Sequence, residues 1–279
     1  MIVVTGAGGQ VGTALASLLP DAVSLRREQL DLSHPGRVSD VLDRLAADTI
    51  INCAAYTAVD RAEDEEDLAT TVNGVAVGEL ATWVASRGAR LVTFSTDYVF
   101  PGDGEKPYLE SDPTDPVNAY GRSKLAGELL ALAHVGVLVI RTSWVVSGTH
   151  RNFVATIVRN ARERELRVVD DQRGCPTVAS DLAVATLEAL DAGASGLLHL
   201  TNRGETTWFD LAREAVRLAG LDPGRITPTT TAEYPTPARR PAYSVLGSER
   251  RPGIGIAALP HWKDSLPSVV DGLVALGMA

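Results

Sequence analysis

The sequence is poor in cysteine and histidine, and each shortage removes a class of protein from consideration. Its two cysteines, Cys53 and Cys175, lack the short paired spacing of a zinc site or a redox motif, so a disulfide framework is not expected. Its five histidines are scattered and include no His-x-x-x-His spacing. We therefore predict neither a disulfide-stabilised fold nor a resident metal ion.

Long apolar runs and clustered positive charge are also missing. Apolar runs such as Gly136–Ile140 are far shorter than the roughly 20 residues that span a bilayer, and the N-terminus does not resemble a secretion signal. The net charge of -9 argues against nucleic acid, because phosphate backbones are bound by clustered Lys and Arg. We expect a cytoplasmic protein, monomeric or homodimeric, with no membrane or nucleic-acid partner.

The sequence does contain a regular alternation of short apolar runs with longer amphipathic stretches, and 45% of its residues are hydrophobic, as in ordinary globular proteins. This alternation predicts the α/β class, a Rossmann-type doubly wound parallel sheet with helices on both faces. Ligands of such sheets bind at the carboxyl ends of the strands. The predicted strands are Ile2–Thr5, Ala22–Leu25, Thr49–Cys53, Arg90–Ser95, Val135–Thr142, Leu166–Val169 and Leu197–Leu200.

The pattern also predicts two parts, one with regularly alternating strands and helices and one with a less regular order. Residues 1–145 are expected to form an NAD(P)-binding Rossmann domain, and the later strands at 166–200 are expected to return to its sheet. Residues 146–279 are expected to form mainly a smaller C-terminal substrate-binding lobe, because prolines interrupt the chain beyond residue 201. A final amphipathic helix over Trp262–Leu276 is predicted to pack back, with Pro267 in an early turn.

A glycine-rich loop follows the first predicted strand. Gly6, Gly9 and Gly12 stand at three-residue spacing, and Gln10 and Val11 lead into a predicted helix. The first glycine permits a tight turn, the second allows backbone amides to approach a pyrophosphate, and the third allows close helix–strand contact. Together with the flanking strand and helix, this spacing predicts that all five residues bind a dinucleotide.

Two further segments are assigned to the same cofactor. Arg26 and Arg27 end the second strand, where an acid binds a free ribose 2′-hydroxyl and an arginine binds a 2′-phosphate. We therefore predict NADPH, with NADH as the alternative. After the third strand, Ala54, Ala55 and Tyr56 follow in a segment of mostly small residues that lets the cofactor cross the strand end.

The decisive feature is the pair Tyr120 and Lys124, four residues apart at the start of a predicted helix, so that both face the same side. Ketone reduction requires a hydride for carbon and a proton for oxygen, and a phenol can supply that proton. A neighbouring ammonium lowers the pKa of a phenol and can also hold the nicotinamide ribose. Thr96, at the end of a predicted strand, is expected to orient the carbonyl.

With these residues the chain resembles the extended short-chain dehydrogenases and, among them, the dTDP-4-dehydrorhamnose reductases. The resemblance runs nearly end to end. Its motifs are Gly6–Gly12, Asn52–Asp60, Ser95–Gly102, Tyr120–Glu128, Arg141–Val145, Asp171–Thr177, and Arg240 with Pro241 before Ser244.

The resemblance implies NADPH-dependent reduction of the C4 ketone of dTDP-4-dehydro-L-rhamnose. It implies that Thr96, Tyr120 and Lys124 catalyse, and that Asp31 and Leu32 contact the adenine. The expected contacts to the nucleotide sugar are Thr96, Asp97, Tyr98, Tyr120, Trp144 and, for the diphosphate, Arg240 or its neighbour Arg239.

Two alternatives remain open. Another C4-ketoreductase, acting on a different nucleotide deoxysugar, would use the same residues. Non-catalytic NADP-binding regulatory subunits of methionine adenosyltransferase also resemble this family, although an intact Thr96, Tyr120 and Lys124 favour an enzyme. Sugar-nucleotide dehydratases require Asp-Glu after the threonine, where this chain has Asp97 and Tyr98. The acidic run Glu63–Asp67 is interpreted as a solvated helix start.

Overall fold

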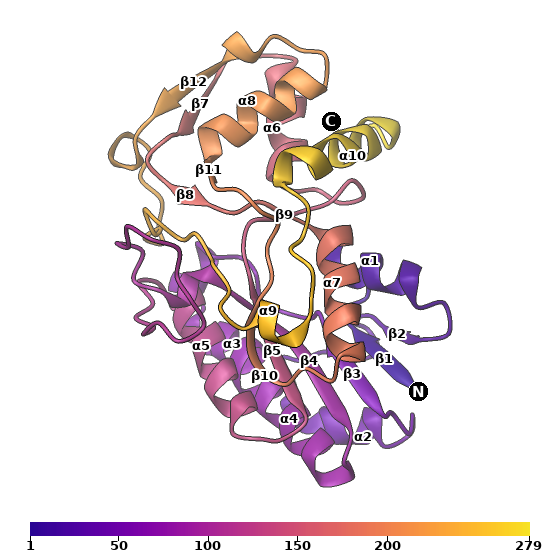
Figure 1. The fold of residues 1–279 in the computed structure, drawn as a ribbon. Helices are drawn as coiled ribbons and strands as arrows, with labels where there is room; N and C mark the ends of the chain where they lie inside the picture. The colour runs from indigo at the N-terminus through magenta and orange to yellow at the C-terminus, as the bar shows by residue number, and fades with distance from the viewer.

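A sheet of six parallel strands forms the centre of the molecule, in a computed structural model that describes all 279 residues. Its strands are β1 (Ile2–Thr5), β2 (Val23–Leu25), β3 (Thr49–Asn52), β4 (Arg90–Thr96), β5 (Val137–Thr142) and β10 (Gly196–His199). They lie in the order β10-β5-β4-β3-β1-β2 (Figure 1). The predicted Rossmann-type sheet is confirmed.

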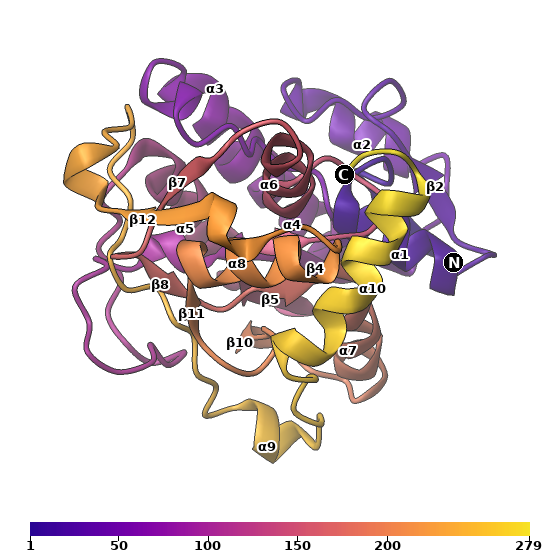
Figure 2. The ribbon, with the colours of Figure 1, turned by 90° about the horizontal axis from the view of Figure 1, so that it is seen from above.

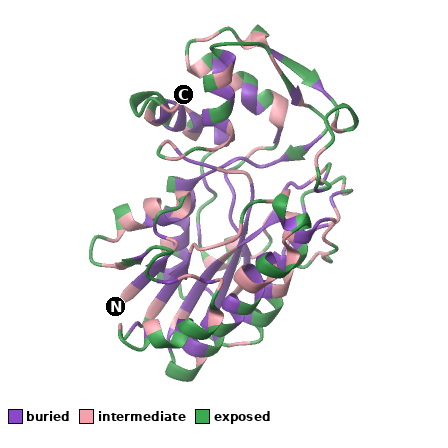
Figure 3. Cartoon of the chain, turned by 180° about the vertical axis from the view of Figure 1, so that it is seen from behind, coloured by how far each residue is buried: buried purple, intermediate pink, exposed green.

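The strands are mostly apolar, as expected for a sheet whose two faces are both covered. Residues of β1, β3 and β4 such as Val4, Ile51 and Val92 are at most 1% exposed. Figure 3 shows these strands as a buried band between helices whose outer faces are exposed. The chain leaves β1 for β2 on one side and reaches β3 on the other, which creates a crevice at the carboxyl ends of β1 and β3.

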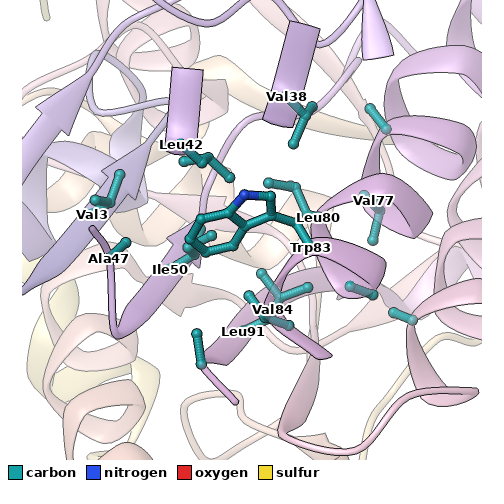
Figure 4. Close-up of a cluster of buried hydrophobic side chains, with 14 of the residues drawn as sticks. Val3, Val38, Leu42, Ala47, Ile50, Val77, Leu80, Trp83, Val84 and Leu91 are labelled. Atoms are coloured by element: carbon teal, nitrogen blue, oxygen red, sulfur yellow. The ribbon is translucent and has the colours of Figure 1, made fainter. Parts of the chain in front are cut away.

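One face of the sheet packs against α2 (Val38–Leu42), α4 (Ala76–Arg87) and part of α5 (Ala119–Leu132). Trp83 of α4 lies in the middle of this apolar cluster, close to Leu42 and Ile50, as Figure 4 shows. The indole N–H of Trp83 donates to Asp43 Oδ1 at 2.7 Å, so its one polar atom is satisfied.

The other face packs against α1 (Gln10–Leu18) and α7 (Ala179–Asp191), with Leu15 and Leu182 fully buried between helix and sheet. Short elements complete this part of the chain. They are η1 (Pro35–Arg37), η2 (Arg61–Glu63), α3 (Glu66–Thr70), the π-helix η3 (Thr71–Val75), η4 (Asp97–Val99) and α9 (Arg251–Ile254).

A second group of elements lies over the carboxyl ends of the sheet strands, as Figures 1 and 2 show from two directions. Its helices are α6 (Phe153–Ala161), α8 (Trp208–Leu218) and α10 (Trp262–Ala275), and it also contains η5 (Pro223–Arg225) and η6 (Thr231–Glu233). Its short strands are β6 (Val145–Val146), β7 (Leu166–Val169), β8 (Arg173–Gly174), β9 (Thr177–Val178), β11 (Thr206–Thr207) and β12 (Ile226–Thr229).

The predicted return of residues 166–200 to the sheet is half right. β10 joins the sheet beside β5, but β7 pairs with β12 in the second group. Leu166–Val169 has the apolar character of a sheet strand, yet Val168 packs against α6 and α8 instead. The separate apolar clusters support our proposal of two parts with a boundary near residue 145.

The predicted last helix is present as α10, and Pro267 lies in its second turn. No helix of the structure is long and apolar enough to cross a membrane.

Candidate active site

The glycine-rich loop joins β1 to α1 at the crevice. Gly6 has a φ of +63°, a conformation that side chains with a Cβ rarely adopt. A Cβ on Gly6 would overlap the backbone of Cys53 and Ala54, and a Cβ on Gly12 would overlap the backbone of Gly6. The predicted tight turn is therefore confirmed, and the close approach that Gly12 allows is between α1 and the loop rather than between α1 and a strand.

A cavity of about 410 Å³ opens beside this loop. Its walls come from the glycine loop, the segment after β2, the end of β3 and the region of η2, α3 and η3. The predicted cofactor residues that line it are Gly6, Gly9, Arg27, Asp31, Leu32, Ala54, Ala55 and Tyr56. Segments that are distant in the sequence are thus brought together as predicted.

The remaining predicted cofactor residues lie outside its walls. The Gln10 side chain points to the second group of elements, where its Nε2 donates to the Val145 carbonyl at 3.1 Å and its Oε1 accepts from Asn152 at 3.1 Å. Val11 packs against the apolar cluster under α1. The others are Gly12, Arg26, Tyr120 and Lys124.

The two adjacent arginines are not equivalent. Arg27 lines the cavity, and its Nε is 3.2 Å from Asp31 Oδ2. The side chain of Arg26 is exposed and does not reach the cavity wall. Successive residues near a strand end point in different directions, so only Arg27 is positioned for a cofactor phosphate.

The predicted catalytic residues meet where β4 ends and α5 begins. Thr96 is the last residue of β4, and Tyr120 is the second residue of α5. A Cβ on Gly121 would overlap the Tyr98 carbonyl, so the glycine lets α5 approach η4 closely. The rings of Tyr98 and Tyr120 meet edge to face with centroids 6.0 Å apart.

Asn118 fixes the start of this helix. Its side-chain oxygen accepts a hydrogen bond from the Gly121 amide at 2.8 Å, and its Nδ2 donates to the Arg239 carbonyl at 2.8 Å. An N-cap of this kind satisfies one of the free amides of the first turn. Here it also ties α5 to the loop that carries Arg240.

Tyr120 is a neutral phenol in this structure. Burial raises the pKa of Tyr120 to about 12, the Thr96 hydrogen bond opposes this shift, and the charge of Asp97 adds to it. Desolvation outweighs the hydrogen bond that lowers the pKa of Tyr120 in this structure. The role of Lys124 in making this phenol more acidic stays a prediction.

Lys124 is buried, and its ammonium donates to the Phe94 carbonyl of β4 at 2.6 Å. Burial lowers the pKa of Lys124 to about 8, and the charge of Glu128 opposes this shift. Glu128 itself pairs with Arg141 at 2.7 Å inside the protein. The amine is thus held against the end of β4, one helical turn from Tyr120.

Asp97 lies directly after Thr96 and is 2% exposed. The Thr96 hydroxyl donates to its Oδ1 at 2.9 Å, while Oδ2 has no hydrogen-bond partner. Burial raises the pKa of Asp97 to about 7, with the hydroxyls of Ser244 and Thr96 opposing the shift. A buried acceptor without a partner is costly, so this oxygen is available to a ligand hydroxyl.

A second cavity, of about 390 Å³, lies on the side of the C-terminal elements. Tyr98 and Arg240 both line it, together with the aromatic residues Phe153, Trp208 and Tyr234. Arg240 Nη2 is 2.9 Å from Asp60 Oδ1, which positions the guanidinium. The predicted substrate residues Tyr98 and Arg240 are therefore brought together in one wall.

Trp144 is not among the residues that line this cavity. Its indole stacks on Trp208 with centroids 3.5 Å apart, and it lies against Gly174, where a Cβ would overlap the ring. Its φ of +46° is unusual for a bulky residue and places strain beside the site. Trp208, which the sequence did not single out, lines the cavity instead.

The acidic run is more structured than a solvated helix start. Glu63 accepts from the Ala119 amide at 2.8 Å, and Glu66 pairs with Arg122 at 2.7 Å, so both connect to the catalytic helix. Glu65 pairs with Arg61 at the cofactor-side cavity. No group of three or more His, Cys, Asp or Glu side chains is arranged to hold a metal ion.

The sequence pattern of the RmlD substrate binding domain matches residues 1–275. The chain belongs to this family. The match covers both the sheet and the C-terminal elements, so the two cavities described above lie within family sequence.

Similar proteins share nearly the whole chain. A protein of Burkholderia thailandensis named dTDP-4-dehydrorhamnose reductase is 43% identical, covering 98% of this chain and 99% of that protein. A Streptomyces antibioticus protein named probable dTDP-4,6-dihydroxy-2-methyloxan-3-one 4-ketoreductase is also 43% identical, covering 98% and 95%. The structure of dTDP-4-dehydrorhamnose reductase from Bacillus anthracis in complex with NADP has a TM-score of 0.91 at 36% identity, covering 95% and 96%.

Some residues that line these two cavities were not assigned from the sequence. Arg61, Glu65 and Val72 line the cofactor-side cavity because η2, α3 and η3 fold over it. Trp208 begins α8 and reaches the other cavity from the C-terminal elements. The charge of Arg61 and its spacing from Glu65 were visible signals, whereas the position of Trp208 depends on tertiary packing alone.

Proposed function

We propose that this chain uses NADPH to reduce the C4 ketone of dTDP-4-dehydro-L-rhamnose to dTDP-L-rhamnose. The observation that carries the proposal is a half-buried, neutral Tyr120 that hydrogen-bonds Thr96 at the end of β4, in a chain whose glycine loop lines a separate cavity. The names of relatives that share nearly its full length, and the NADP bound in the Bacillus anthracis structure, support the same reaction.

The cofactor-side cavity fits a dinucleotide phosphate. Gly6 and Gly12 leave no room for a Cβ, and Gly9 contributes backbone without a side chain to the cavity wall. Arg27 would contact the 2′-phosphate, while Asp31 and Leu32 would contact the adenine. Gln10 and Val11 would bind the cofactor through their position at the start of α1. Arg26 is not expected to contact the cofactor. When bound, the reduced nicotinamide supplies a hydride to the ketone carbon.

Tyr120 would donate the proton that the developing alkoxide requires. Its pKa of about 12 keeps the phenol protonated at neutral pH, which is the form that a reductase needs before the reaction. Thr96 would hold the ketone oxygen beside the phenol. The pKa of Lys124 is about 8, so its amine is mostly protonated at neutral pH. This ammonium would stabilise the phenolate as it forms and hold a ribose hydroxyl.

The nucleotide sugar would lie in the second cavity. Arg240, positioned by Asp60, would pair with the diphosphate, and Tyr98 would line the sugar side. Asp97 Oδ2 would accept a hydrogen bond from a sugar hydroxyl. Trp208 lines this cavity, and Trp144 would contribute to the sugar site by holding the Trp208 ring through stacking.

The test is to incubate the purified chain with NADPH and dTDP-4-dehydro-L-rhamnose, to follow NADPH absorbance, and to identify the product sugar by NMR. We expect stoichiometric oxidation of NADPH and formation of dTDP-L-rhamnose. NADPH binding without turnover would instead support a non-catalytic NADP-binding subunit, and the absence of any dinucleotide binding would reject both.

A second candidate is the reduction of another nucleotide 4-ketosugar. The 43% identity to the Streptomyces antibioticus 4-ketoreductase favours it as much as the equal identity to the Burkholderia protein favours the first. Competition between dTDP-4-dehydro-L-rhamnose and its ring-substituted analogues, compared by kcat/KM, separates the two. The cytoplasmic location and the monomeric or dimeric state stay predictions.

A further inference from the structure

The mouth of the cofactor-side cavity carries a second arginine that the glycine loop and the Arg26–Arg27 pair do not account for. Arg61 lines the cavity, and its Nη2 is 2.5 Å from Glu65 Oε1. The other carboxylate oxygen, Glu65 Oε2, accepts the Tyr56 hydroxyl at 2.6 Å. Arg61, Glu65 and Tyr56 thus form a connected group along one wall, which we call the Arg61 group.

A buried residue anchors the Arg61 group. The Tyr56 amide donates to Asn73 Oδ1 at 2.9 Å, and Asn73 Nδ2 donates back to the Tyr56 carbonyl at 3.0 Å. Asn73 is 1% exposed and lies in the π-helix η3, a form of helix that is frequent at functional sites. The guanidinium of Arg61 is therefore held in place although its side chain is 71% exposed.

The Arg61 group places a positive charge in a part of the chain that is otherwise acidic. The chain has a net charge of -9, and the acidic run Glu63–Asp67 begins two residues after Arg61. An anionic cofactor would be repelled here unless cations line its site. Arg27 and Arg61 are the cations in the cavity wall, and each pairs with a carboxylate four residues later.

We infer that Arg61 is a phosphate ligand of the cofactor, held at the cavity mouth by Glu65 and Tyr56. The inference rests on the proposed function and adds a binding residue to it. Glu65 engages only Nη2 of the guanidinium, so the Nη1 and Nε groups remain free to donate. Charge-assisted hydrogen bonds from arginine to phosphate are among the strongest polar contacts in proteins.

Two phosphates of the cofactor share this chemistry, the ribose 2′-phosphate and the pyrophosphate. Arg61→Met removes the charge and keeps an apolar side chain of similar length. We expect the dissociation constant for NADPH, measured by nicotinamide fluorescence, to rise about tenfold. An unchanged value for NADH assigns Arg61 to the 2′-phosphate, and an equal rise for NADH assigns it to the pyrophosphate.

The matched control is Arg217→Met, because Arg217 also pairs with a single nearby acid, Glu214, and is 57% exposed, but lies on α8 away from this cavity. Its affinity for both dinucleotides is expected to match that of the wild type. Thermal midpoints without cofactor check that both variants are folded.

Equal affinity of Arg61→Met and the wild type would overturn the inference, as would an equal loss in both variants. Either result leaves the proposed function intact, because the wild type still binds NADPH and turns over. Failure of the wild type to bind any dinucleotide would reject the proposed function itself, so the two failures are distinguishable.

Discussion

Tyr120 is half-buried at the start of α5, and its phenol is protonated at neutral pH. Replacing it with phenylalanine keeps the ring and its edge-to-face contact with Tyr98 and removes only the proton donor. We expect Tyr120→Phe to lose at least about a hundredfold in kcat while the NADPH dissociation constant stays within about twofold. Full retention of kcat would contradict the assignment of this residue.

Asp97 makes the stability of the protein depend on pH in an unusual direction. The pKa of Asp97 is raised in the folded chain to about 7, so the folded state holds a proton that the unfolded state has lost above about pH 4. The contribution of this carboxyl is therefore fully present below its unfolded pKa and is lost as pH rises through about 7. Its titratable neighbours Tyr98, Tyr120 and Cys175 are neutral in this range.

Asp97→Asn removes that titration. As pH rises from about 5 to 8, the wild type should lose roughly 3 kcal/mol of unfolding free energy that the variant does not lose. Urea denaturation of both proteins at the two pH values measures it. A constant difference in unfolding free energy across this range would show that the pKa of Asp97 in the folded chain is not raised into it.

At the scale of elements, α5 is placed by glycines as much as by apolar side chains. Gly127 faces the backbone of Asn73, and a Cβ there would overlap the Asn73 carbonyl. Gly127→Ala must therefore push α5 away from η3, at a cost of roughly 1–3 kcal/mol in unfolding free energy. Lower kcat is expected as well, since the same helix carries Tyr120.

The matched control is Gly253→Ala in α9. A Cβ at Gly253 meets nothing within 4 Å, and its φ is ordinary. This substitution is expected to leave stability unchanged or to raise it by about 0.5 kcal/mol, because alanine loses less backbone entropy on folding. A similar loss in both variants would mean that the contact with Asn73 does not explain the effect at Gly127.

Most elements of the sheet could be predicted from the sequence, because strands covered on both faces need continuous apolar runs. The element that the prediction misplaced, β7, shows the limit of this argument. Its apolar residues need a covered face, but α6 and α8 provide that face as well as the central sheet would. Which surface covers a short apolar strand depends on contacts between distant segments, and these leave no local pattern.

At the scale of the whole molecule, Arg240 joins the sheet part of the chain to the C-terminal elements through Asp60. Arg240→Met should raise the KM for the nucleotide sugar about tenfold, because a paired diphosphate loses its cation, while NADPH affinity stays unchanged. Asp60→Asn, which breaks the pair but keeps the guanidinium, should raise KM less. A larger effect of Asp60→Asn would assign Arg240 a purely structural role.

The candidate site was predictable to the extent that chemistry and spacing define it. Thr96 and Tyr120 come together because a strand end and a helix start are adjacent in this sheet order. The pKa of Tyr120 was not predictable from the spacing to Lys124, because desolvation of the ring is its largest cause and depends on the surrounding fold. Likewise Arg26 and Arg27 are adjacent in sequence but only one reaches the cavity.

In the segment from Arg61 to Glu66, most charged side chains contact a different part of the structure. Glu63 caps α5, Glu65 anchors Arg61, and Glu66 pairs with Arg122. Inserting or deleting a single residue here would rotate all of these side chains away from their partners at once. Natural variants of this enzyme should consequently tolerate exchanges of residue type in this segment while conserving its length.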